Sequence, residues 1–252
     1  MTRARSRRGP GVVVAALLLA LVLGAPARSR ASTLEGIAGW EQDGYDQAYG
    51  FATLGGALPA GGGTSLPLRV TGSYLTYNYE STEGPLKVTG PGASAMAGVR
   101  NAGARGYVSL LAGAEIRWER RGPRDLPLTG AVVARGGFVA QAEGELAWTR
   151  RLHPFALANY SGSARYAYGR AGLRWQVSNL DWQGPVAWSL GIEGVGQGNS
   201  DTDAVQAGAM VECALVRSRL SLSAHAGYKD SASSDGGRRQ GGYAGVGLYR
   251  RF

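Results

Sequence analysis

The sequence predicts an all-β protein, a single antiparallel up-and-down β-barrel of the outer-membrane type with about 12 strands, within a range of roughly 10 to 14. Three observations support this prediction. An export leader opens the chain, alternating segments fill residues 34 to 252, and the last segment ends on Phe252. Because Cys213 is the only cysteine, no intramolecular disulfide can form, and stability must come from hydrogen bonding and burial.

The first 31 residues have the three parts of a secretory signal peptide. Arginines are followed by an apolar run from Val12 to Leu23 and by small residues that allow cleavage after Ala27 or Ala31. The run of about 12 residues is too short for a membrane-spanning helix, which needs ~20. We therefore expect residues 1–31 to be a signal peptide and residues 32–252 to form the barrel, since lipid leaves a chain without such helices no other way to pair its backbone.

The formal net charge of +9 lies mostly in this leader. Six of the 27 basic residues precede the first acidic residue, Glu35, which leaves 21 basic against 18 acidic side chains in the rest of the chain. Those charges are mixed in sign and form no nucleic-acid motif. The composition therefore argues against a nucleic-acid partner.

Apolar residues alternate with small or polar residues throughout the rest of the chain. In the segment 108–119 the even positions are apolar, while the odd positions include Glu115 and Arg117. Successive strand side chains point to opposite sides, so each such segment has one face suited to lipid and one suited to water. The predicted strands are 34–41, 48–57, 66–80, 89–101, 106–119, 130–149, 155–163, 165–177, 185–196, 204–216, 219–228 and 242–252.

The final segment resembles the C-terminal strand of bacterial outer-membrane proteins, in which a terminal Phe marks the chain for barrel insertion. Ala244, Val246 and Leu248 share a face with Phe252. Arg250 lies on the same face and departs from that pattern. We expect Arg250 at the periplasmic rim, where its side chain reaches the head groups at a cost of ~0 to 1 kcal/mol.

Tryptophan and tyrosine recur near the ends of the predicted strands. There they would form girdles at the two membrane interfaces, although the core of a soluble sandwich would explain the same rings. Many segments reach ten or more residues, the length that crosses a bilayer as a tilted strand, which favours the barrel. The candidate girdle residues are Tyr107, Trp118, Trp148, Trp175, Trp188 and Tyr228.

The residues opposite the apolar rows are expected to point into the barrel. They carry both signs, so they would either line a hydrated conduit or pair into a lattice that fills a narrow barrel. Inward charges of opposite sign neutralise one another, and this favours the lattice. The candidate lumen-lining residues are Glu115, Arg117, Glu119, Glu143, Glu145, Arg170, Arg174, Glu193, Glu212 and His225.

We expect no catalytic, metal or cofactor site. Two histidines and one cysteine without clustered ligand spacing argue against zinc. A lipid-modifying hydrolase is the enzymatic alternative, because His225 shares a strand face with Ser221 and Ser223, and Asp230 follows. A polar lumen histidine beside strand serines explains the same pattern without chemistry.

Aromatic residues near the tips of the first two predicted hairpins are candidates for sugar binding. Exposed rings stack on the apolar faces of sugars, while anchoring at the membrane interface would explain these rings without a ligand. The candidate glycan-stacking residues are Trp40, Tyr45, Tyr49, Tyr77 and Tyr79.

Several short stretches, taken in order, resemble the family of bacterial cellulose biosynthesis protein BcsS. They include Gly39-Trp40, residues 74–79, residues 165–174 and Gly191-Ile192-Glu193. The resemblance implies an outer-membrane or periplasmic accessory of cellulose production or export, with no established catalytic residues. The partners it implies are outer-membrane lipid and a glucan chain or cellulose secretion components. A generic porin-like or structural outer-membrane barrel is the alternative.

Overall fold

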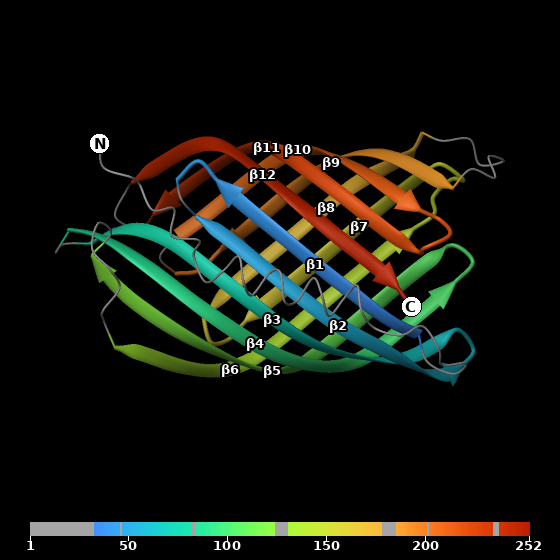
Figure 1. Cartoon of the computed structure of the whole chain (residues 1–252), viewed down its shortest axis with the longest axis horizontal. Helices are drawn as coiled ribbons and strands as arrows, with labels where there is room; N and C mark the ends of the chain where they lie inside the picture. The colour runs from blue at the N-terminus through green and yellow to red at the C-terminus, as the bar shows by residue number, and fades with distance from the viewer. Residues whose placement is uncertain are drawn as a thin grey trace, which may run out of the picture.

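The computed structural model describes residues 33–45, 47–81, 84–123, 131–177, 185–200, 202–233 and 237–252. The predicted signal peptide lies outside these ranges. Within them, twelve antiparallel strands form one closed barrel, and β1 pairs with both β2 and β12 (Figure 1). The strands are β1 (Thr33–Asp43), β2 (Ala48–Gly61), β3 (Thr64–Ser81), β4 (Gly84–Gly103), β5 (Gly106–Pro123), β6 (Val132–Leu146), β7 (Leu152–Ser161), β8 (Tyr166–Gln176), β9 (Val186–Gly198), β10 (Thr202–Leu215), β11 (Leu220–Ser233) and β12 (Arg238–Arg251). The predicted up-and-down barrel is confirmed.

Alternation along each strand separates an apolar outer face from a polar inner face. In β5, Leu110 is 61 % exposed, while its neighbours Ser109 and Leu111 are buried. In β9, Ile192 is 65 % exposed beside the buried Glu193. The outer face is the one that lipid would cover. No helix in the described part of the chain is long and apolar enough to cross a membrane.

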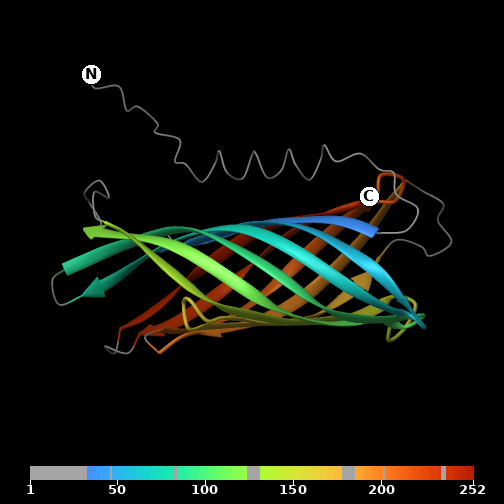
Figure 2. The ribbon, with the colours of Figure 1, turned by 90° about the horizontal axis from the view of Figure 1, so that it is seen from below.

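The first residue of β1 and the last residues of β12 lie at one end of the barrel, called the terminal end here; the opposite end is the far end. The backbone N–H of Phe252 donates to the carbonyl oxygen of Leu34 at the terminal end (2.8 Å). The hairpin of β2 and β3 also lies there, while the hairpins of β3 with β4 and of β5 with β6 reach the far end (Figures 1 and 2). Every position in the barrel can therefore be assigned to a terminal or a far half.

Several strands run further toward the far end than the sequence predicts. β4 begins at Gly84, five residues before its predicted start, and β11 extends to Ser233 rather than to residue 228. The added part of β11 carries polar residues such as Lys229 and Asp230 on both faces. The backbone ladder therefore continues there, while the alternation of apolar and polar residues that predicts a strand fades.

Most of the predicted girdle residues lie on the outer face in two bands. Trp175 and Trp188 lie near the terminal end, with Trp148 in the adjoining turn, and Trp118 and Tyr228 lie toward the far end. All five are at least 38 % exposed. These positions suit two membrane interfaces.

Tyr107 is the exception among the predicted girdle residues, and its prediction was wrong. It pairs with Glu145, an inward residue, and the guanidinium of Arg100 lies 5.0 Å from the centre of its ring inside the barrel. Arg250, by contrast, lies at the terminal end of β12, where its guanidinium packs 4.8 Å from the Phe252 ring. The sequence predicts Arg250 at this same end of the strand.

Candidate functional site in the barrel interior

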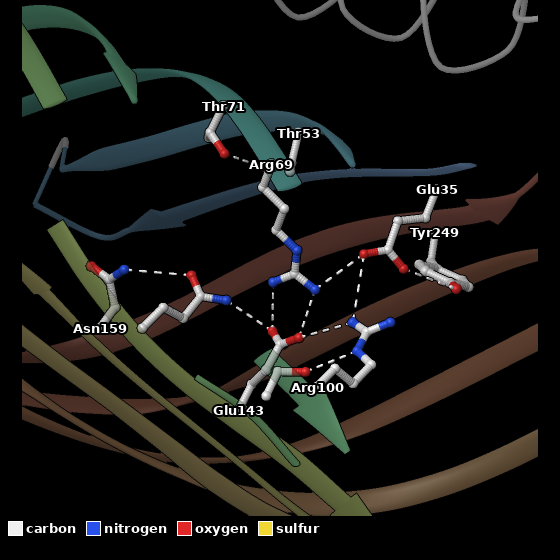
Figure 3. Close-up of polar contacts among 10 residues, drawn as sticks. Glu35, Thr53, Arg69, Thr71, Arg100, Glu143, Asn159 and Tyr249 are labelled. Carbon is white, nitrogen blue, oxygen red and sulfur yellow. Dashed lines mark hydrogen bonds and ion pairs between the residues drawn. The ribbon is translucent and has the colours of Figure 1, made fainter. Parts of the chain in front are cut away.

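The terminal half of the interior holds a group of ion pairs around Arg69. This residue projects inward from β3, and its two terminal nitrogens reach Glu143 on β6 at 2.8 and 2.6 Å and Glu35 on β1 at 3.1 Å (Figure 3). The Arg69 side chain is only 4 % exposed. Gly55 on β2 leaves room beside this position, because a Cβ there would make tight contacts, 3.2 Å from Cγ of Glu35 and 3.3 Å from Cγ of Arg69.

Arg100 on β4 joins the same group. Its Nε donates to the Ser109 hydroxyl at 2.8 Å, and Nη2 lies 3.3 Å from Glu143 and 3.6 Å from Glu35 (Figure 3). Two carboxylates are thus shared by two guanidinium groups. This sharing offsets the cost of removing each charge from water, which a lone buried charge could not do.

A second group of ion pairs continues from β6 to β10. Arg174 on β8 donates to Glu145 on β6 and to Glu212 on β10, the latter at 2.5 Å. Nδ1 of His153 lies 3.3 Å from Glu145, and the Phe155 ring centre lies 5.4 Å from the Arg174 guanidinium.

The two groups are continuous because Glu143 and Glu145 stand on the same face of β6. We call the combined set the inner lattice. It links β1, β3, β4, β6, β8 and β10 through the interior rather than through neighbouring backbone pairs. Its members are Glu35, Arg69, Arg100, Glu143, Glu145, Arg174 and Glu212.

The far half holds inward tyrosines beside its arginines. Tyr49 near the start of β2 and Tyr166 and Tyr168 at the start of β8 all face inward. Arg117 on β5 has a buried Nε with no hydrogen-bond partner among the described residues, as does Arg69 in the inner lattice.

Polar pairs in the far half run along the wall. Glu41 on β1 lies 3.2 Å from the amide nitrogen of Gln206 and 3.4 Å from Nε2 of His225. Arg170 binds Glu193 on the adjacent strand, and the Tyr243 hydroxyl donates to the other Glu193 oxygen at 3.0 Å. Like the inner lattice, these contacts join strands up to three positions apart in the barrel.

The predicted lumen-lining residues all belong to the inward face, divided between the two halves. Glu143, Glu145, Arg174 and Glu212 are in the inner lattice, whereas Arg117, Arg170, Glu193 and His225 lie farther along the barrel. Glu115 accepts hydrogen bonds from the hydroxyls of Ser161 and Ser163 and from the Ser163 backbone N–H, at 2.6 to 2.9 Å. Glu119 pairs with Arg121 and Arg135 near the far end. Arg69 and Arg100 were not predicted, although each sits in a strand whose alternation places it opposite exposed valines.

The predicted glycan-stacking residues do not form one group. Trp40 lies on the outer face of β1, where its ring covers Gly50. The Tyr45 hydroxyl is bound at the far end, where it donates to the Gln240 carbonyl and accepts from the Gln240 N–H. Tyr49 and Tyr77 face inward, and the Tyr79 side chain lies outside the described part of the structure. Tyr166 and Tyr168 also face inward and were not predicted to do so, although they alternate with Ala167 in step with Arg170 and Arg174.

The alternative hydrolase site is not assembled. His225 faces inward and is paired with Glu41, whereas Asp230 lies on the opposite face of β11, held by Arg238 at 3.0 Å. In the described part of the chain, no group of three or more His, Cys, Asp or Glu side chains is placed to hold a metal ion.

Comparison with known proteins finds one matching family model and solved structures with a similar fold. No curated protein matches the sequence significantly. Among solved structures, the translocator domain of the autotransporter NalP from Neisseria meningitidis shares the barrel fold, with a TM-score of 0.51, 16 % identity and 96 % of each chain covered. The beta domain of the Bordetella autotransporter BrkA has a TM-score of 0.49 at 16 % identity, covering 87 % of this chain and 98 % of that one. The family model described as cellulose biosynthesis protein BcsS matches residues 42–252, and the chain therefore belongs to the BcsS family.

Proposed function

We propose that this protein is a non-catalytic accessory of bacterial cellulose production that resides in the outer membrane. Family membership over residues 42–252 is the observation that carries the proposal. The apolar outer face and its two aromatic bands support a lipid environment around the barrel. Its terminal end faces the periplasm in this proposal, because an even number of strands brings the start of β1 and the end of β12 to the same side and the predicted export leader delivers the chain from there.

The inner lattice favours an anchoring or assembling role over a passage for the glucan chain. Its ion pairs join strands two or three positions apart, and a polymer moving through the terminal half would have to break several of them. Breaking a buried pair by removing one partner costs about 3 to 5 kcal/mol. We therefore expect the growing glucan to cross the membrane by another route. The role of this barrel is to anchor or assemble glucan or the secretion components at the membrane.

Deletion of the gene tests this function. We expect the deletion to lower acid-insoluble glucan at the cell surface and the wild-type gene to restore it. Complementation with the His225→Ala variant should restore it equally, because no catalytic step depends on that side chain. Unchanged glucan after deletion would overturn the cellulose role, and failure of the folded His225→Ala protein to complement would overturn the non-catalytic role. Fractionation adds a separate check, since the mature protein should be recovered in the outer membrane with heat-modifiable gel mobility.

A further inference from the structure

The terminal end of the barrel, at the label C in Figure 1, carries exposed arginines in several turns and at the end of β12. The inner lattice already holds the acidic residues described in this half of the barrel. The end therefore has a positive charge that the described residues do not neutralise. We call it the arginine rim. Its exposed members without an acidic partner among the described residues are Arg105, Arg150, Arg217, Arg219 and Arg251.

Charges described at the far end have both signs, and several of them are paired. Lys229 donates to Asp43 at 2.8 Å, and Arg238 binds Asp230 at 3.0 Å. The excess of positive charge is therefore a property of the terminal end and not of the described barrel as a whole.

A hollow of about 490 Å³ opens inside the mouth of the barrel at the arginine rim. Ala214, Ser221 and Tyr249 lie directly across from one another on the inward faces of β10, β11 and β12 and line it. Arg219 and Arg251 form the next row, where the Arg251 backbone N–H donates to the Arg219 carbonyl oxygen at 3.0 Å. Since side chains alternate along each strand, both rows face the lumen rather than the surrounding lipid.

Arg219 and Arg251 are like charges directly opposite each other, an arrangement that destabilises a strand pair. Glu35 lies across from Arg251 in the pairing of β1 with β12, but its carboxylate is directed to Arg69 at 3.1 Å and to Arg100 at 3.6 Å. A bound anion would neutralise both guanidinium groups, which bind carboxylate or phosphate through paired hydrogen bonds. The pair therefore indicates an anionic ligand.

The surroundings of this pair favour an acidic protein segment over other anions. Positive charge extends along the rim to Arg105, so a ligand with several negative charges is attracted more strongly than a single phosphate. Val216 in the hollow is 57 % exposed and offers an apolar contact to a peptide side chain, which an anionic polysaccharide lacks. Lipid head groups surround the outer wall, whereas the hollow faces the lumen.

We propose that the arginine rim docks an acidic segment of a periplasmic protein partner. Carboxylates of the segment bind Arg219 and Arg251, and an apolar side chain beside them packs on Val216. This inference rests on the proposed function, which turns the terminal end toward the periplasm, and it names the kind of partner that the accessory would assemble.

Fluorescence anisotropy of the labelled peptide Glu-Glu-Leu-Glu-Glu-Leu, with the purified mature protein in an uncharged detergent, tests the proposal. We expect saturable binding, and binding at least about tenfold weaker for Gln-Gln-Leu-Gln-Gln-Leu, because the amides cannot form charge-assisted hydrogen bonds of the same strength. Arg219→Gln and Arg251→Gln should each weaken binding of the acidic peptide about fivefold, since each removes one such contact at an exposed site. Heat-modifiable gel mobility identifies the folded variants, and the second rim variant keeps the test decisive if the first does not fold.

Arg165→Gln is the matched control for Arg219→Gln. Both arginines are exposed in tight turns with a left-handed backbone, at φ angles of 49° and 51°, but Arg165 lies at the far end. The control variant loses the same charge, so its affinity for the acidic peptide should remain that of the wild type.

Any of four results would overturn the docking surface. They are no binding of the acidic peptide to the folded wild type, unchanged affinity in the folded rim variants, equal weakening by Arg165→Gln, and equally tight binding of a hexauronate, which would indicate a general polyanion surface. The deletion experiment is independent of these results. Lowered glucan after deletion with no peptide binding would retain the accessory function and reject the docking surface, while peptide binding that depends on Arg251 with unchanged glucan would do the reverse.

Discussion

The two ends of the barrel interior place the same kind of ion pair in different surroundings. In the terminal half, the Arg69 side chain is 4 % exposed, and Glu143 and Glu35 are shared between Arg69 and Arg100. At the far end, Glu119 pairs with Arg121 and Arg135, whose side chains are 48 % and 49 % exposed. A buried guanidinium depends on its carboxylate for compensation, while an exposed one can be solvated by water instead. The comparison separates ion pairs on which the stability of the barrel depends from pairs that contribute little.

The largest expected effect on stability is that of Glu143→Ala in the inner lattice. The variant leaves Arg69, whose side chain is 4 % exposed, and Arg100 with Glu35 as their remaining carboxylate. Removing one partner of a buried ion pair costs about 3 to 5 kcal/mol, and the remaining Glu35 places this variant near the lower value. Reversible urea unfolding in lipid vesicles measures the change in the free energy of unfolding.

Glu119→Ala is the matched control in the far half. The arginines that pair with Glu119 are nearly half exposed, and pairs screened by water contribute only ~0 to 1 kcal/mol. An equal loss of stability in the two glutamate variants would remove the distinction between buried and exposed ion pairs.

A smaller effect is expected from Tyr243→Phe. The Tyr243 hydroxyl donates to Glu193 at 3.0 Å, and the Glu193 side chain is 1 % exposed. A hydrogen bond to a charged group contributes about 1.5 to 3 kcal/mol, and Arg170 keeps the carboxylate paired in the variant. Urea unfolding should therefore show a loss in the free energy of unfolding near the lower end of this range. Tyr228→Phe on the outer face should change stability by less than ~0.5 kcal/mol, and a similar loss in both would contradict the role given to the Tyr243 hydroxyl.

Much of the fold was predictable because a barrel between lipid and water imposes a period of two on every strand. The segment from Val108 to Trp118 shows that period without interruption, and its exposed and buried positions fall as predicted. The family was predictable from the order of Gly- and Tyr-rich stretches. Tyr107 was misassigned because its aromatic character was given more weight than its place in the alternation, which puts it on the face of Glu115.

The site was predictable only in part, since alternation gives the face of a residue but not its partner. Glu143 was expected inside, yet its pairing with Arg69 depends on how β3 and β6 approach across the closed barrel. The contact of Glu41 with Gln206 depends on the same closure, because the two residues are more than a hundred residues apart in the chain. No local pattern brings strands together across an interior. That information comes from the number of strands and their register.

Passage of sugar through the reconstituted barrel tests the central claim most directly. In a liposome-swelling assay with cellobiose, the wild-type protein should cause no more swelling than protein-free vesicles, because the ion pairs of the inner lattice cross the terminal half. Combining Arg69→Ala with Arg174→Ala should raise the swelling rate if the double variant folds. Wild-type swelling at the rate of an open porin would contradict the account, since the ion pairs would then leave a passage through the terminal half.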